Sequence, residues 1–168
     1  MAGKSEAAVP VCQITFYGVT LVQIMRKESG LVMKRVTIIL DKNLEMGAAA
    51  NAAALLMGQA ALMDPTIYAE APVFDKSGIR HAGIKYSTVI LKAGENQLLN
   101  LLQTLPADNS GLSHAVFSKN GQLLNNAFEQ YAEEISAKQT EETKVVGVIL
   151  WGEEELVRST TKKYSVLK

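Results

Sequence analysis

Short apolar runs alternate along the chain with longer segments of helical pattern. The short continuous runs are typical of buried strands and cover residues 36–40, 85–92, 113–117 and 144–152. The longer segments have helical periodicity or composition and cover an alanine-rich stretch ending before Asp64-Pro65, then residues 94–105, 118–138 and 153–163. Strands that alternate with helices predict an α/β domain. Its mixed, mainly parallel β-sheet would have about four core strands sandwiched between helices.

Three smaller signals refine this prediction. Residues 73–80 resemble a hairpin turn, with Gly78 at the position that needs a positive φ. Ser118 could N-cap the helix that follows it, and residues 164–168 could form an edge strand.

The chain is expected to hold one domain, residues 33–168, preceded by an N-terminal extension, residues 1–32. Alternating apolar positions in the extension allow a strand. Residues 7–25 are long enough to span a membrane, but Pro10 and Gly18 interrupt the run and no cleavage pattern follows it. The sequence therefore predicts a soluble protein.

Charge and cysteine content narrow the classes of function. The 17 basic and 17 acidic residues cancel, so no bulk field draws the chain to nucleic acid or membrane. The single Cys12 allows no internal disulfide, which fits the cytoplasm. His81 and His114 are far apart in the sequence and offer no metal-ligand spacing, so we expect neither a metal nor a cofactor.

The alanine-rich helix has no polar face, so we expect it to be buried on nearly all sides. A buried amide at Asn51 would then need hydrogen-bond partners, because an unsatisfied one costs about 1–3 kcal/mol. Asp41, at the end of the preceding strand, could supply an acceptor. Asn51 would either hold the loop in place or face a ligand.

The start of this helix is the candidate binding site. Gly47 and Ala48 leave the first backbone N–H groups uncovered, as in many phosphate and carboxylate sites. No Gly-Lys-Ser/Thr follows, so this is not a Walker loop. Asp41 and Glu45 bring negative charge to the same place, which disfavours a purely anionic ligand.

Two motif blocks resemble an uncharacterised, largely bacterial family of domains of unknown function. The resemblance extends from about residue 34 to the C-terminus. That family is distantly similar to type II peptidyl-tRNA hydrolases, which implies their fold, a mixed β-sheet between two layers of helices. The first block matches through Asp41, Leu44, Gly47, Ala50, Asn51 and Ala54; the second through Asp75, Gly78, His81, Gly83, Ile84, Leu91 and Lys92.

The chain departs from those hydrolases at the positions that carry their polar chemistry. Ala48 and Ala50 stand where they have lysines, Ala54 where they have a glutamine, and Met57 where they have a histidine. Residues 117–120 replace their Asp-Ala-Gly-Arg turn. We therefore do not expect peptidyl-tRNA hydrolysis, and whether the chain is an enzyme stays open.

The sequence favours a non-hydrolytic protein that binds a small polar or anionic ligand where the first strand, loop and helix meet. One alternative is a divergent hydrolase or transferase acting on a tRNA- or nucleotide-related substrate, with Asp41 or His81 as general base. Another is a self-associating scaffold, such as a homodimer, without a ligand. The predicted ligand-binding residues are Asp41, Gly47, Ala48, Asn51, His81 and Lys92.

Overall fold

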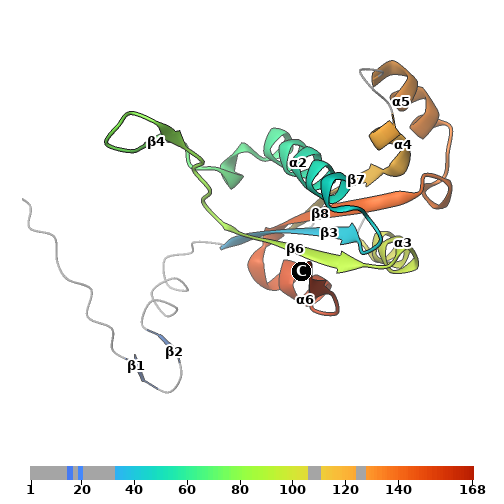
Figure 1. Ribbon diagram of the computed structural model, residues 1–168. Coiled ribbons are helices and arrows are strands. Elements are labelled where there is room, and N and C mark those ends of the chain that lie inside the picture. Colours follow the sequence, from blue (N-terminus) through green and yellow to red (C-terminus); the bar gives the residue numbers. More distant parts are fainter. Residues whose placement is uncertain (1–14, 17–18, 21–32, 106–110, 124–127) are drawn as a thin grey trace, which may run out of the picture. The chain divides into compact units, whose positions relative to one another are not determined.

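A computed structural model describes residues 15–16, 19–20, 33–105, 111–123 and 128–168 (Figure 1). The chain divides into two units, Met1–Val32 and Met33–Lys168, and each is considered by itself. In the first unit, β1 (Thr15–Phe16) and β2 (Val19–Thr20) pair in antiparallel fashion. The predicted alternation of the extension also involves Ile14 and Leu21, which lie outside the described residues.

The second unit is built on a five-stranded sheet whose strand order is β7-β8-β3-β6-β9. Only β3 and β6 are parallel, while the other three pairs are antiparallel. The predicted mixed sheet of about four core strands, with an edge strand within residues 164–168, is therefore present, but the prediction that it is mainly parallel is wrong. The strands are β3 (Lys34–Asp41), β6 (Ser87–Ala93), β7 (Leu112–Ser118), β8 (Val145–Glu153) and β9 (Ser165–Val166).

Helices cover both faces of this sheet (Figure 1). One face packs against α2 (Met46–Met63), and the other packs against α3 (Glu95–Thr104) and α6 (Glu154–Thr161). The α2 core contains Val36, Ile38, Leu40, Ile149 and Trp151 from the sheet. The opposite core contains Ile39, Leu91, Val148, Leu150, Leu98, Leu101 and Val157.

Helix α2 buries only one side, so the prediction that it is buried on nearly all sides is wrong. The side facing the sheet is Ala49, Ala52, Leu56 and Ala60. On its outward side, Leu55 is 48% exposed and Leu62 76% exposed. Alanine carries no polarity that could mark which side of the helix is outward. By length and composition α2 could also cross a membrane, but here one face lies on the sheet.

A glycine in the sheet lets α2 lie close to β8. A Cβ atom added at Gly147 would lie 2.9 Å from both Leu40 and Leu56. That separation is closer than a side chain permits, so the absence of a side chain at Gly147 is part of the packing.

The predicted hairpin is confirmed. It consists of β4 (Val73–Phe74) and β5 (Arg80–His81), which pair in antiparallel fashion. Gly78 has φ +82°, as predicted, and its N–H donates to the Asp75 carbonyl at 3.1 Å. The hairpin extends away from the sheet beyond the beginning of β6 (Figure 1).

In the region of the predicted helix over residues 118–138, a helix starts at Lys119, directly after Ser118, the residue predicted as its N-cap. The buried Oγ of Ser118 makes no hydrogen bond within the described residues, so Ser118 does not cap the helix through its side chain. The helical residues of this region form α4 (Lys119–Leu123) and α5 (Phe128–Ser136); two 3-10 turns elsewhere are η1 (Pro65–Ile67) and η2 (Thr140–Glu142).

Candidate functional site

The two parallel strands end side by side, and their helices leave in opposite directions. Asp41 and Ala93 are register partners, and the Lys42 N–H donates to the Ala93 carbonyl at 2.8 Å. Helix α2 follows β3 onto one face of the sheet, while α3 follows β6 onto the other. In open α/β sheets, ligands bind outside the carboxyl ends of strands at such a reversal. We call residues 41–47 and 93–95 the mouth.

The first loop of the mouth is organised by Asp41. Its Oδ1 accepts hydrogen bonds from the backbone N–H and the side-chain amide of Asn43, at 3.0 and 3.1 Å. Its carbonyl accepts from the Leu44 N–H at 3.1 Å, and Leu44 packs against the core beneath α2. Asn43 therefore makes the hydrogen bonds to Asp41 that hold the loop, a role that the sequence suggested for Asn51. The second carboxylate oxygen, Oδ2, has no hydrogen-bond partner among the described residues.

The two helix starts at the mouth differ. At α3, Gln97 Oε1 accepts from the Gly94 N–H at 2.8 Å, so a side chain of the first turn covers this helix start. At α2, Glu45 makes no capping hydrogen bond through its side chain. A Cβ atom added at Gly47 would meet nothing within 4 Å, so the space in front of it is open. The accessible helix start is that of α2.

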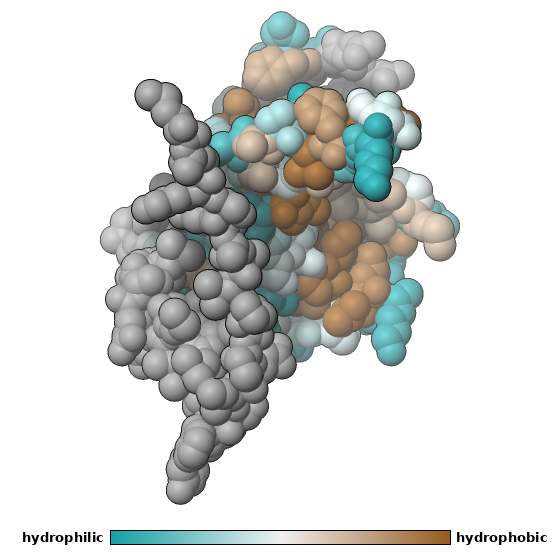
Figure 2. Space-filling model, turned by 90° about the vertical axis from the view of Figure 1, so that its left-hand side faces the viewer, coloured by the Kyte–Doolittle hydropathy of each residue, from teal (hydrophilic) through white to brown (hydrophobic). Residues whose placement is uncertain are grey.

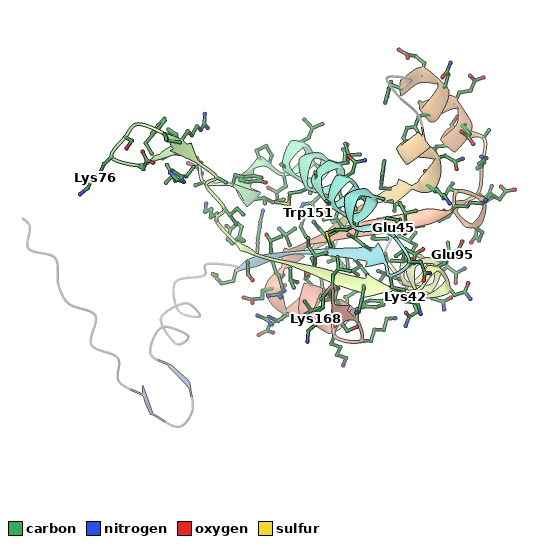
Figure 3. All side chains as sticks on the ribbon, viewed as in Figure 1. Lys42, Glu45, Lys76, Glu95, Trp151 and Lys168 are labelled. Atoms are coloured by element: carbon green, nitrogen blue, oxygen red, sulfur yellow. The ribbon has the colours of Figure 1, made fainter. Side chains whose placement is uncertain are left out.

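Charges of both signs surround this opening. Lys42, Glu45 and Glu95 lie at the same end of the domain (Figure 3). A Cβ added at Gly94 would lie 3.9 Å from Lys42 Cε, so this lysine reaches across to the second loop. Lys92 is half-buried beside Leu40, its register partner. Mixed charge suits a polar ligand with both donors and anionic groups better than a polyanion.

Asn51 is exposed, so the prediction that it is a buried amide is wrong. It lies one turn after Gly47, and residues four apart on a helix share a face. No hydrogen bond joins its side chain to another residue in the described ranges. Asn51 therefore lies on the outer rim of the mouth, together with the exposed Gly47 and the half-buried Ala48.

His81 is not part of the mouth. Strand β6 begins at Ser87, which pairs with Arg35, and ends beside Asp41. His81 precedes β6 and lies on the hairpin, at the other end of the sheet. Figure 3 shows the same separation, because Lys76 of the hairpin and Glu45 lie at opposite ends of the domain. Asp41 and Lys92 thus lie near the C-terminal ends of β3 and β6, and Gly47, Ala48 and Asn51 lie in the first turns of α2, while His81 lies on the hairpin.

The hairpin holds His81 against an aspartate that sequence reasoning did not select. His81 Nε2 lies 3.1 Å from Asp75 Oδ2. Asp75 Oδ1 accepts from the N–H groups of Ser77 and Ile79, at 2.8 and 3.0 Å. The hydrogen bond with His81, followed by those from the backbone, lowers the pKa of Asp75. Both residues belong to the second motif block, and that shared block was the available signal.

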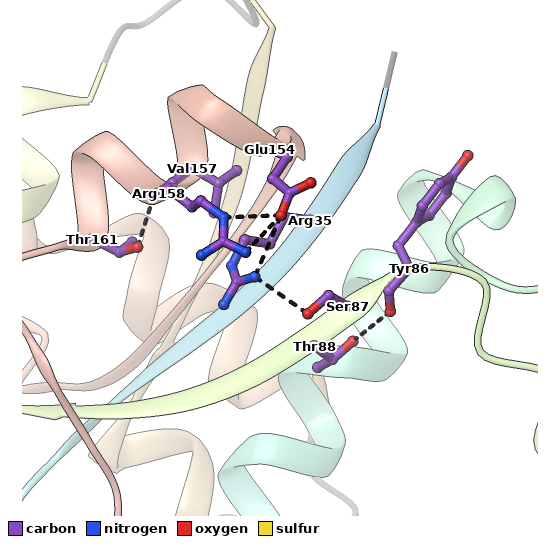
Figure 4. A network of polar contacts seen from close by, with 8 residues as sticks. All are labelled: Arg35, Tyr86, Ser87, Thr88, Glu154, Val157, Arg158 and Thr161. Atoms are coloured by element: carbon purple, nitrogen blue, oxygen red, sulfur yellow. Dashed lines mark hydrogen bonds and ion pairs between the residues drawn. The ribbon is translucent and has the colours of Figure 1, made fainter. Parts of the chain in front are cut away.

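A separate polar network lies at the N-terminal ends of the parallel strands β3 and β6 (Figure 4). Arg35 Nη1 donates to Ser87 Oγ at 3.2 Å and lies 3.8 Å from Glu154 Oε1. Arg158 Nη2 lies 2.8 Å from the same oxygen of Glu154. Burial, and then the charge of Arg158, lowers the pKa of Arg35, while Glu154 opposes the change. Since every charged group here has a partner, the network joins α6 to the sheet.

Within the described residues, no group of three or more histidine, cysteine, aspartate or glutamate side chains could hold a metal ion. Comparison with known proteins matches residues 34–168 to a family described as protein of unknown function (DUF2000). The solved structure of Atu0240, a protein of unknown function from Agrobacterium tumefaciens strain C58, superposes with a TM-score of 0.70 at 19% identity. The match covers 80% of this chain and 98% of that one.

None of the curated proteins matches the chain. The solved structure shares the fold, and the family match covers nearly the whole second unit. The chain belongs to the DUF2000 family of proteins of unknown function.

Proposed function

We propose that this protein binds a small polar or anionic molecule at the mouth without hydrolysing it. The proposal rests on the C-terminal ends of β3 and β6. There Asp41 lies beside Ala93, and α2 and α3 continue to opposite faces of the sheet. At the C-terminal ends of such strands, α/β folds position loops and helix starts around a ligand.

Several residues in and beside the mouth have distinct roles in this proposal. Asp41 Oδ2 accepts a hydrogen bond from a hydroxyl or ammonium group of the ligand. The N-terminus of α2 at Gly47 attracts an anionic group of the ligand, because the helix dipole and backbone N–H groups are favourable there. Lys42 and Lys92 add positive charge on the β6 side, and Asn51 donates from the rim.

The uncharged surface of α2 disfavours hydrolysis of peptidyl-tRNA. Type II peptidyl-tRNA hydrolases, which the sequence resembles and whose fold we propose for this chain, place lysines at the positions of Ala48 and Ala50. In this protein Ala50 and Ala54 are exposed and Ala48 and Met57 are half-buried, so this part of the helix surface is uncharged. Such a surface offers nothing to tRNA phosphates. We therefore propose that the partner is a small molecule; a cytoplasmic location is proposed because the single Cys12 fits a reducing compartment.

The test is a thermal-shift screen of the purified chain against sugar phosphates, nucleoside monophosphates and hydroxy acids. A ligand at 100 times its Kd should stabilise the protein by about 2.7 kcal/mol, which raises Tm by several degrees. Gly47→Leu should abolish the response, because it fills the open space before the helix. Gly58→Leu is the matched control, since Gly58 is on the same helix and also faces open space.

If no compound raises Tm, or if both leucine variants respond like the parent chain, the mouth is not the binding site. A parallel assay with peptidyl-tRNA tests the other half of the proposal. We expect no turnover, and enzyme-like cleavage would identify a hydrolase instead.

A second candidate function is self-association as a homodimer, and a specific observation favours it. The outward side of α2 exposes Leu55, Leu62 and Met63, and the whole helix carries no charged residue. Exposed apolar rows of this kind mark interaction surfaces. A second copy of the chain would bury them by packing α2 against α2.

A further inference from the structure

The base of the hairpin borders an open pocket that lies apart from the mouth. Its volume is about 230 Å3, and it lies between residues 68–73 and residues 80–83. The register pair Val73–His81 closes it at one end, and the Ala69 N–H, which donates to the Gly83 carbonyl at 2.7 Å, closes it at the other. Between these two pairings, the first segment has three residues, 70–72, and the second has one, Ala82. The longer segment therefore bulges outward and leaves the space.

The lining of this pocket is basic and partly apolar. Arg80 and His81 are the basic residues of the lining, and no lining residue is a carboxylate, although the Asp75 carboxylate contacts His81 from outside the lining. Pro72, Val73 and the alanines supply apolar surface. In Figure 2, which views the domain from the hairpin side, apolar side chains gather in the middle of the face next to hydrophilic ones.

Backbone donors add to the positive character of the pocket. The N–H groups of Ala71 and Ala82, both lining residues, donate to no acceptor in the part of the chain that the structure describes. His81 is also held in place, because its Nε2 lies 3.1 Å from Asp75 Oδ2 and Asp75 is itself fixed by two backbone N–H groups.

We propose that this pocket is a second binding site, which takes a small organic anion with an apolar body. Arg80 and His81 meet the charge of the ligand, and Pro72 and Val73 contact its apolar part. The volume corresponds to roughly seven or eight water molecules at ~30 Å3 each, so the ligand is the size of a small carboxylate.

The two histidines of the chain allow a direct test by NMR, with benzoate as the probe. His114 lies on β7, away from the hairpin, and serves as the internal reference. Benzoate should shift the ring Cε1–H resonance of His81 saturably, with a Kd in the range of about 1–10 mM expected for a fragment of this size. The His114 resonance should stay in place, and benzyl alcohol, which has no charge, should shift neither.

Matched variants separate the pocket from general charge attraction. Arg80→Gln should weaken benzoate binding about tenfold, the usual scale for a hydrogen bond to a charged group. Lys76→Gln removes the same charge from the exposed turn outside the pocket lining and should leave the affinity within about twofold. Arg80→Lys should retain most of the binding, which shows that a loss in Arg80→Gln does not come from an unfolded hairpin.

Three results would overturn this inference: no saturable His81 shift up to about 50 mM benzoate, an equal shift with benzyl alcohol, or equal weakening by Lys76→Gln and Arg80→Gln. Gly47→Leu should leave the benzoate response unchanged, so the two sites are tested independently.

Discussion

Asp41 and Ala93 lie beside each other as the last residues of the parallel strands β3 and β6. Because these two strands are parallel, the loops and helices that follow them start at the same end of a sheet whose other strand pairs are antiparallel. The consequences for ligand binding, packing and stability can be measured separately.

The carboxylate of Asp41 should be needed for binding at the mouth but not for folding. In Asp41→Asn the side-chain oxygen can still accept from Asn43, while the charge that faces the ligand is lost. For a ligand with a donor group, we expect affinity to fall about tenfold with little change in Tm. Isothermal titration of a screening hit measures this. Glu45→Gln is the control, because it removes an exposed charge from the same loop, and an equal loss there would contradict the specific role of Asp41.

Any side chain at Gly147 should destabilise the domain. Gly147→Val would force α2 away from β8, and overpacking of this kind typically costs about 1–3 kcal/mol. Urea unfolding followed by circular dichroism measures the free energy of unfolding. Gly58→Ala should change it in the opposite direction by about 0.5–1 kcal/mol, since a Cβ there meets nothing and alanine favours the helix. Unchanged stability in Gly147→Val would show that α2 is not held this close.

Glu154 should matter more for stability than Arg158. The side chain of Arg35 is only 12% exposed, and Glu154→Gln would leave its guanidinium with a neutral partner. We expect a loss of about 1–2 kcal/mol in the free energy of unfolding. The Arg158 side chain is 59% exposed, so Arg158→Gln should cost at most about 0.5 kcal/mol. Equal losses in thermal unfolding of the two variants would contradict this order.

The hairpin turn should loosen in acid. Asp75 has a pKa below its ordinary value of 3.8, so its carboxylate favours the folded turn above that pH. The stabilisation is lost as the pH falls through the lowered pKa. The amide resonances of Ser77 and Ile79 should therefore move together with a midpoint below pH 3.8. Asp75→Asn should remove this transition, and a midpoint above the ordinary value would contradict the assignment.

If the chain forms a homodimer, the outward side of α2 should hold it together. Leu62→Glu would place a charge in the apolar row and should convert the dimer to a monomer, as measured by sedimentation equilibrium. Gln103→Glu adds the same charge at an exposed polar position of α3, which packs on the other face of the sheet, and should leave the dimer intact. A parent chain that is monomeric at about 100 μM would remove this candidate, because the association free energy would then be weaker than about −5.5 kcal/mol.

Local structure was predictable where side chains determine it. Gly78 identified the hairpin, and the leucines of residues 98–105 identified the buried side of α3. Strand direction was not predictable, because the apolar run of β8 is buried on both faces whichever way it runs. The exposed side of α2 was missed because alanine fits either environment.

The same distinction applies to the candidate sites. Asp41 and Lys92 each come near the end of a strand, and the parallel pairing of β3 and β6 brings them to one edge. His81 shares a motif block with Lys92, but the sequence gives no distance between the hairpin and the far end of β6. The pocket beside His81 depends on the unequal lengths of the two chain segments at the base of the hairpin, which no periodicity reveals.

Among the described residues, the hairpin joins the sheet through the chain that enters and leaves near Tyr68 and Ile84. Its residues contribute nothing to either buried core beyond that crossing. A change in its length or composition would therefore leave the scaffold intact, so that specificity at this end of the molecule could diverge between homologues while the fold stays the same.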